Sequence, residues 1–305
     1  MPCASPWTGW WSEVASTQVS ETIGAAGTRM GSAAWRQFRS NPAGLLGVAI
    51  ILASVILAVV GPLVTPYTPS QDVGVVFAPP SLDHPMGTDH LARDVFSRFI
   101  VGTRVSLLVG LSAATLATAI GLLVGAAAGF LGGKTDSVLM RLVDIVLTIP
   151  LLILGMALAA IVGPSIVNIV LIIALLAWPS TARLVRSEFL TIREREYVRA
   201  AEAVGSSSWW IVFREILPNV APVILVAWSF EVGAAIIVEA GLSFLGLGDI
   251  QAGSWGIMLH DAQRFLRDAW WMAVFPGLGI ALAVLAANLV GEALNDAFDP
   301  KLRIR

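Results

Sequence analysis

The sequence predicts an all-α integral membrane protein with six membrane-spanning helices. Of its 305 residues, 56% are hydrophobic and 13% are charged, whereas a soluble domain carries roughly 25% charged residues. Long stretches hold no charge at all, notably 105–133 and 145–181. A large core does not explain this deficit, because a soluble chain still needs a charged surface.

The elements follow from these charge-free stretches. Residues 1–39 are polar and lack a signal peptide's features, so we expect a cytoplasmic tail there and a membrane domain over 40–305. A helix needs about 20 residues to cross ~30 Å of hydrocarbon. The segment Gly163-Pro164-Ser165 divides one stretch that is too long for a single helix. The expected spans are Leu45–Val64, Val105–Leu131, Leu139–Val162, Ile166–Thr181, Ala221–Leu242 and Trp271–Val290.

Glycine and proline add detail to two spans. Gly121, Gly125 and Gly129 recur every four residues in the second span, a spacing that lets another helix approach closely. Pro150 is expected to kink the third span.

The positively charged residues predict the orientation. With the N-terminus inside, the inner segments hold 14 of the 19 Lys and Arg residues and the outer segments hold 5. Because inner loops are enriched in Lys and Arg, both termini and the segment 196–218 are expected in the cytoplasm.

That segment, EYVRAAEAVGSSSWWIVFREILP, is polar in an apolar chain. A helix over Arg193–Val204 would carry one stripe at i, i+3, i+4 and i+7 spacing. Gly205 suits the left-handed residue that ends a helix, and one of the serines 206–208 can cap the next. The stripes comprise Tyr197, Ala200, Ala201 and Val204 in the first helix and Trp209, Phe213, Ile216 and Leu217 in the second, which Pro218 is expected to close.

Two interpretations of this double helix are open. The small side chains of Ala200, Ala201 and Ala203 permit close contact with another surface, which favours a docking element for a soluble partner. The alternative is a re-entrant hairpin that packs only on its own subunit.

The pattern A-A-x-x-x-G followed by I-L-P resembles the cytoplasmic EAA loop of ATP-binding cassette importer permeases. The family's usual Glu precedes the two alanines, where this chain has Arg199, so the ion pair of that Glu is not implied here. The resemblance implies a coupling loop over about 184–220, with contact residues Glu196, Tyr197, Ala200, Ala201, Ala203, Gly205, Leu217 and Pro218.

Further motifs resemble the dipeptide, oligopeptide and nickel group of these permeases. The stretch HPMGTDHLARDVFSR (84–98) is similar to an external motif that marks one of two paired permeases, with Ala92 where Gly is usual. MRLVDIVLTIP, EAGLSFLGLG, SWGIML and DAFDPKLR follow in the same order. The resemblance implies the type I importer fold in a bacterial inner membrane, a related second permease, two cytoplasmic ATPase subunits and an external solute-binding protein. Peptides are the expected cargo, with nickel complexes, glutathione or other small solutes as alternatives.

Three acidic residues lie in or near the spans. Glu231 is the deepest, and a membrane acid is a functional candidate; a role in the cargo path and a hydrogen bond to a neighbouring helix are both open. Glu239 is expected to brace the outer loop, and Asp144 to pair with Arg141. The outer segment predicts a helix over 255–266 whose apolar residues face lipid or the partner, followed by a tryptophan pair, Trp270 and Trp271, at the membrane interface.

Other classes of function are disfavoured. Gly132-Gly133-Lys134-Thr135 resembles the end of a P-loop, but Ala128 replaces the first Gly and no strand precedes it. We therefore expect no ATP site, no catalytic residue and no cofactor in this chain. One cysteine and three scattered histidines predict no metal site, and the net charge of -2 with no basic domain gives no sign of nucleic-acid binding. An ion-driven secondary transporter, for which an inverted repeat is expected, is the remaining alternative.

Overall fold

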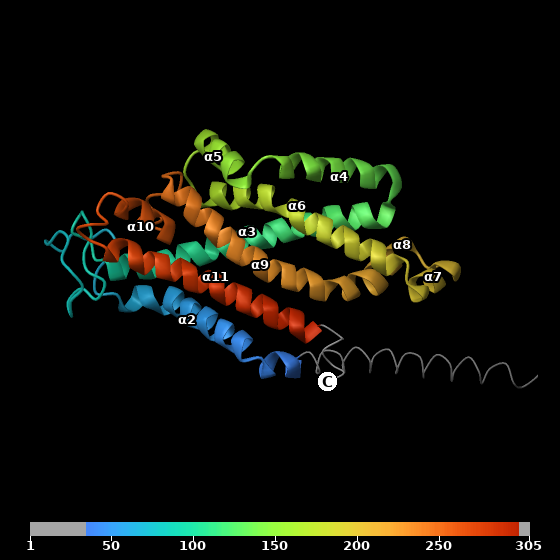
Figure 1. The fold of residues 1–305 in the computed structure, drawn as a ribbon, viewed down its shortest axis with the longest axis horizontal. Coiled ribbons are helices and arrows are strands. Elements are labelled where there is room, and N and C mark those ends of the chain that lie inside the picture. Colours follow the sequence, from blue (N-terminus) through green and yellow to red (C-terminus); the bar gives the residue numbers. More distant parts are fainter. Residues whose placement is uncertain (1–34, 299–305) are drawn as a thin grey trace, which may run out of the picture.

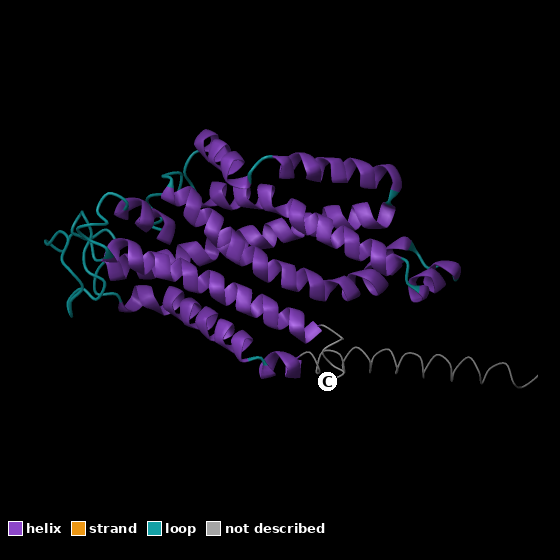
Figure 2. Ribbon diagram, in the orientation of Figure 1, coloured by secondary structure: helices purple, strands orange, loops and turns teal. Residues whose placement is uncertain are grey.

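The computed structural model describes residues 35–298, and over this range the chain forms helices and loops only (Figure 2). Two isolated bridges, Asp72 with Arg93 and Thr88 with Asp94, are the closest approach to sheet structure in this range. The long helices are α2 (Pro42–Val64), α3 (Val95–Leu131), α6 (Ile166–Arg193), α9 (Leu217–Phe244) and α11 (Trp271–Phe298). The tail expected over residues 1–39 lies outside the described residues, except for its last five, which are helical and pack through Phe38 on α11.

Five spans are single helices, and the third is broken. The segment predicted as one kinked helix forms α4 (Gly133–Thr148) and α5 (Leu151–Val162), which meet at 85°. Ile149 is extended because the ring of a following proline disfavours helical backbone. The carbonyl of Pro150 then accepts the amide of Leu154 and begins α5 afresh. The kink expected at Pro150 is therefore a complete break.

The five single-helix spans are longer than the sequence predicted, and α3 and α6 differ most. Helix α3 begins at Val95 rather than Val105, and α6 continues to Arg193 rather than ending at Thr181. Charge-free stretches locate only the part of a helix that suits hydrocarbon, whereas helical hydrogen bonds continue through charged turns. The side chain of Asp94 caps α3 by accepting the amide of Ser97 at 2.8 Å.

The long helices lie side by side, and the connecting segments gather at the two ends of the bundle (Figure 1). Helix α7 (Glu196–Ala203) marks one end, which also holds the start of α2 and the end of α11. The loop 65–94 and the short helix α10 (Trp255–Ala262) mark the other end. We call these the α7 end and the α10 end.

The predicted glycine row is confirmed as the contact between α3 and α6. A Cβ on Gly125 would lie 2.5 Å from the carbonyl oxygen of Ala182, and one on Gly129 would lie 2.7 Å from the Cβ of Phe189. Only glycine permits this separation, and close packing is the main attraction between helices in lipid.

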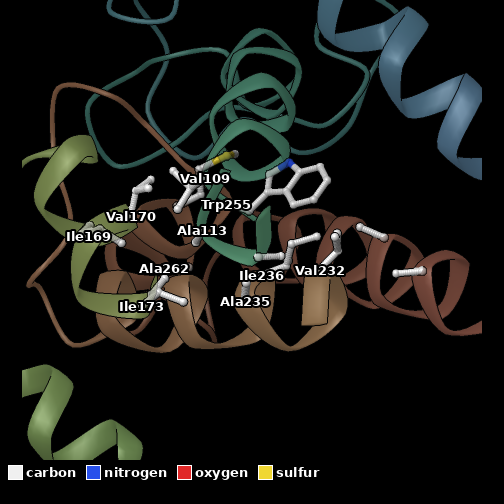
Figure 3. Close-up of a cluster of buried hydrophobic side chains, with 14 of the residues drawn as sticks. Val109, Ala113, Ile169, Val170, Ile173, Val232, Ala235, Ile236, Trp255 and Ala262 are labelled. Carbon is white, nitrogen blue, oxygen red and sulfur yellow. The ribbon is translucent and has the colours of Figure 1, made fainter. Parts of the chain in front are cut away.

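A hydrophobic core joins α3, α6, α9, α10 and α11 near the α10 end (Figure 3). Trp255 is 2% exposed, and its indole N–H donates to the carbonyl of Phe99 at 3.2 Å. The predicted outer helix ends at Ala262 instead of Leu266, and Met258 and Ala262 face this core rather than lipid or a partner. The prediction was wrong for these two residues because the helix folds inward onto the bundle, whereas Leu266 is exposed as expected.

The predicted aromatic belt is only half right. Trp270 is half-exposed, but Trp271 is buried and donates its indole N–H to the carbonyl of Thr88 at 3.0 Å. Trp271 thus holds the loop 65–94 against α11.

Candidate functional site

The chain bends at Gly205 as predicted. Helix α7 ends with the amide of Gly205 bonded to Glu202 and the amide of Ser206 bonded to Ala201, the hydrogen-bond pair of a Schellman motif. Gly205 has φ +81°, in the left-handed region that favours glycine. Ser207 caps the next helix, since its hydroxyl accepts the amide of Trp210.

One face of this segment anchors it to the bundle. Val198 of α7 and Ile216 are fully buried and pack with Val185 and Phe189 of α6. Burying side chains of this size stabilises the contact by about 1.5–3 kcal/mol each. Val198 was not among the residues predicted from the sequence, because it lies beside the predicted stripe and not within it.

Three of the four residues in the predicted stripe of α7 are exposed, and the fourth, Ala201, is partly buried against the cluster of Val198. Tyr197, Ala200 and Val204 all face away from the bundle, and Val204 is 83% exposed. Within the described chain the segment packs on its own subunit through one face only, which leaves the other face available to a partner. One face of α7 is thus exposed, while its other face packs against the bundle.

The second helix does not stop at Pro218. A short α8 (Ser208–Trp210) passes through a π-helical segment, η1 (Ile211–Ile216), into α9. Pro218 has no amide hydrogen and its ring crowds the preceding turn. The π turn relieves this crowding, because the amide of Leu217 donates to the backbone carbonyl of Val212, five residues earlier. The side-chain amide of Asn219 donates to the backbone carbonyl of Glu215. One continuous helix thus runs from Ser208 to Phe244.

Arg199, which replaces the usual Glu of the loop, pairs with Glu194 on the surface. Both side chains are about two-thirds exposed, so the pair contributes little stability. Arg199 lies in a regular α7, so the exposed face carries a positive charge where the family's motif has a negative one.

Two arginines of α6 connect the segment to the rest of the α7 end. Arg193 donates to the carbonyl of Phe130 at 2.7 Å, where α3 ends. Arg186 makes a two-point contact with Asp136 of α4 at 2.5 and 2.6 Å. Because these partners lie 50 or more residues apart, sequence spacing alone did not reveal them.

At the α10 end, the external motif forms a buried charge cluster. Asp89 accepts from Arg93 at 2.7 Å and from Arg98 at 2.6 Å, and both arginines also reach Asp261. Burial alone raises the pKa of Asp89, but the amide of Arg93 and the two guanidinium charges outweigh it and hold this pKa below its ordinary value. The cluster therefore keeps its charges and ties loop 65–94 to α3 and to Asp261 in α10.

The motif's departure at Ala92 has a conformational explanation. Ala92 has φ +54° and is 4% exposed. A left-handed backbone costs a non-glycine residue roughly 1–2 kcal/mol. The family's usual glycine suits this position, and Ala92 occupies it only because the surrounding contacts enforce the turn.

Glu239 braces the outer segment as expected. Its carboxylate is 2% exposed and accepts the hydroxyls of Ser243 at 2.7 Å and Ser106 at 3.4 Å. The Ser106 hydroxyl in turn accepts the amide of Trp255. These contacts link α3 and α9 to the start of α10.

Glu231 lies in a different environment, beside a hollow in the bundle. It lies midway along α9, is partly buried, and has no hydrogen bond or ion pair within residues 35–298. It lines a hollow of about 280 Å³ between α4, α5, α6 and α9, at the break made by Pro150. Apart from Ser180, the other lining residues are apolar: Val146, Leu147, Ile149, Pro150, Leu151, Leu154, Leu176, Ala177 and Ala234. Within residues 35–298, no neighbouring helix supplies the hydrogen bond that was one of the two alternatives for Glu231.

Asp144 does not pair with Arg141 as predicted. It accepts from Arg183 of α6 at 2.5 Å, and both side chains are more than half exposed. Arg141 lies one turn away on the same helix, but the neighbouring α6 supplies a cation that the sequence separation of 39 residues concealed.

The P-loop-like stretch has the wrong surroundings for a nucleotide. Gly132 and Gly133 form a left-handed turn between helices α3 and α4, and Lys134 lies in the first turn of α4. A P-loop follows a strand, and none precedes this turn within the described residues. In the same range, no group of three metal-ligating side chains is present.

The fold and these sites define a multi-pass helical membrane protein with a solvent-facing helical bend at one end and a braced loop platform at the other. A family model described as a binding-protein-dependent transport system inner membrane component matches residues 121–304. A second, described as the N-terminal TM domain of oligopeptide transport permease C, matches residues 30–80.

Known relatives cover most of the chain. It is 39% identical over 274 residues to the dipeptide transport system permease protein DppC of Bacillus subtilis, covering 88% of this chain and 85% of that protein. The probable D,D-dipeptide transport system permease protein DdpC of Escherichia coli is 38% identical, covering 86% and 89%. The di/tripeptide transport system permease protein DppC of Pseudomonas aeruginosa is 39% identical, covering 88% and 91%. The chain belongs to the family of binding-protein-dependent transport system inner membrane components.

Proposed function

We propose that this chain is the permease subunit of an ATP-driven importer of dipeptides or oligopeptides, and that the segment of about 184–220 couples it to cytoplasmic ATPase subunits. The observation that carries the proposal is the geometry of α7. Its inner side is fixed by Val198 and by the partly buried Ala201, while the face with Tyr197, Ala200 and Val204 is exposed at one end of the bundle. Such a face offers a soluble partner a rigid docking surface.

The continuous helix provides the route for coupling. A force on α7 passes through the Gly205 bend to Ser208, and from there along one helix to Glu231. Arg186 and Arg193 hold α4 and α3 to the same end, so these helices would move with α6. Closure of two ATPase subunits would then rock the helices that border the hollow.

The remaining parts of the transporter follow from the same proposal. A second, related permease would complete the path, and an external solute-binding protein would deliver cargo at the α10 end. The α7 end and both termini would lie in the cytoplasm, supported by the Lys and Arg bias of the sequence. Residues 1–39 would form a cytoplasmic tail and residues 40–305 the permease domain.

ATP hydrolysis belongs to the partner subunits in this proposal. The chain itself would be no enzyme and would bind no cofactor, which agrees with the helical surroundings of Lys134. The peptide cargo is supported by the relatives, whose names describe dipeptide and di/tripeptide transport. No described contact favours nickel complexes, glutathione or ion-driven transport.

The test begins with a pull-down of the chain from detergent-solubilised native membranes. We expect a second permease and soluble ATPases to co-purify, and ATP turnover to rise when binding protein and a dipeptide are added. In an Ala200→Glu variant the ATPases should be lost, because a charge on the exposed face blocks docking. Ala43→Glu is the matched control, since Ala43 is exposed in the first turn of α2 at the same end.

A chain that elutes alone and supports no ATP turnover would refute the coupling role. Retention of ATPases without any response to peptides would refute the peptide cargo and direct the search to nickel complexes and glutathione.

A further inference from the structure

Charged groups are distributed unevenly over the surface that faces the membrane. The middle of α2 and of α11 exposes apolar side chains only, such as Leu52, Ile56, Leu278 and Leu285. The surface of α4, α6 and α9 instead carries Glu231, Ser180 and the Asp144–Arg183 pair.

These polar groups lie next to one another. Glu231 and Ser180 line the same hollow. Arg183 follows Ser180 by three residues, one helical turn towards the α7 end, and residues three apart share a helix face. A polar strip therefore runs from the hollow to the Asp144–Arg183 pair.

Such a strip does not suit contact with acyl chains. A charged group at the bilayer centre costs about 2.5–3.5 kcal/mol on insertion scales and is found facing a bundle interior or water. Both members of the Asp144–Arg183 pair are more than half exposed, so this chain alone does not shield them. The deeper part of the strip, with Glu231 and Ser180, therefore suits contact with water or a partner chain rather than with acyl chains.

A comparison of the two acids of α9 shows which one is free to bind. Glu239 is satisfied by the hydroxyls of Ser106 and Ser243. Glu231 has no such donor within the described residues and opens onto the hollow. An unpaired carboxylate in an apolar wall is complementary to a cation that arrives from outside the chain.

We propose that the hollow is a transit site for a cationic ammonium group, the free amino terminus of a peptide, which Glu231 and Ser180 hold, and that the Asp144–Arg183 pair closes its inner side. The ammonium has three donors, which the carboxylate of Glu231 and the hydroxyl of Ser180 accept. This inference rests on the proposed peptide transport, and it names the residues of this chain that would contact the cargo during transport.

Transport in proteoliposomes tests the transit site. The complete complex, with binding protein and alanyl-alanine, is assayed for uptake and ATP hydrolysis together. Glu231→Gln keeps the shape and removes the charge, so we expect peptide uptake per ATP to fall at least about tenfold. Binding-protein-stimulated ATP hydrolysis should stay within about twofold, because α7 is unchanged. Glu292→Gln, which alters an exposed acid near the end of α11, should leave both rates at the wild-type value.

Cysteine labelling tests the polar strip without requiring transport. Cys3 is the only cysteine in the sequence, so a Cys3→Ser background has no native thiol. We expect Ser180→Cys and Ala234→Cys in the assembled complex to react with a membrane-impermeant cationic thiosulfonate at least tenfold faster than Leu52→Cys and Leu285→Cys. The two control positions are about half-exposed on the apolar surface.

The outcomes separate this inference from the proposed function. Unchanged uptake per ATP in Glu231→Gln, or equal labelling at all four cysteines, would overturn the transit site. A wild-type complex that imports no peptide would instead overturn the proposed cargo, and fast labelling at Ser180→Cys would still identify the strip as water-lined.

Discussion

Replacing Gly205 tests whether the bend between α7 and α8 is required for coupling. Gly205 has φ +81°, and no atom lies within 4 Å of the position that a Cβ would occupy. The cost of a substitution is therefore purely conformational within this chain. It amounts to roughly 1–2 kcal/mol for a simple side chain and more for a β-branched one.

This energy converts to a loss in the population of the bent segment. A cost of 1–2 kcal/mol lowers the ratio of bent to unbent segments roughly 5- to 30-fold. Because the apparent Kd is the intrinsic Kd divided by the bent fraction, we expect the apparent Kd of the ATPase subunits to weaken by up to this factor in Gly205→Ala and by more in Gly205→Val. Gly205→Asn should lose least, because asparagine tolerates the left-handed region best.

The assay titrates purified ATPase subunits onto permease complexes in nanodiscs and follows both binding and ATP turnover. The thermal stability of the permease should hardly change, because Val198 anchors α7 independently of the bend. Equal affinity in all three variants would refute the backbone argument. A loss in Gly205→Asn as large as in Gly205→Val would show that side-chain volume at the docking surface, and not backbone strain, decides the effect.

Four further substitutions give separate tests. Ala92→Gly should stabilise the protein by about 0.5–1 kcal/mol, since it removes left-handed strain at the expense of unfolded-state entropy; a melting curve of the detergent-solubilised protein that shows a lower Tm would contradict this. Gly125→Leu should destabilise it by about 2 kcal/mol or more, because its Cβ meets the carbonyl of Ala182; unchanged unfolding would exclude tight packing of α3 on α6. Asp89→Asn should cost up to about 3 kcal/mol, because it removes the buried carboxylate that Arg93 and Arg98 share and leaves both to the charge of Asp261. Because the pKa of Asp89 is lowered in the folded state, its contribution is present above the unfolded pKa of about 3.9 and is lost as pH falls through the folded pKa. The variant's stability deficit should therefore stay constant from pH 7 to pH 5 and shrink only in stronger acid, and a deficit that already shrinks near pH 6 would contradict this. Lys134→Ala should leave ATP turnover of the assembled complex nearly intact, whereas a loss typical of a P-loop lysine would overturn the assignment of Lys134 to a helix start.

The sequence predicted the spans well because hydrocarbon imposes a local rule. Each buried backbone group in lipid must bond within its own helix, so a charge-free stretch of sufficient length is enough to identify a span. The bend at Gly205 was also predictable, since glycine and the following serines encode it over four residues. Pro150 signalled a disturbance, but the 85° angle depends on what α5 packs against.

Side-chain partners between helices were the main failures. Asp144 was assigned to Arg141 by local spacing, whereas the structure gives it Arg183 from a different helix. Met258, Ala262 and Trp271 were placed at the surface because an amphipathic stripe does not say which neighbour it faces.

By itself, then, the sequence determined the membrane location, the helical class, the glycine row and the polar bend, all of which depend on residues within about one or two helical turns. Only the tertiary structure decided which acid of α9 is satisfied and which is free. Glu239 and Glu231 are two helical turns apart on one helix, but their surroundings differ. Ser243 and, from another helix, Ser106 donate to Glu239, whereas the break between α4 and α5 leaves a hollow beside Glu231.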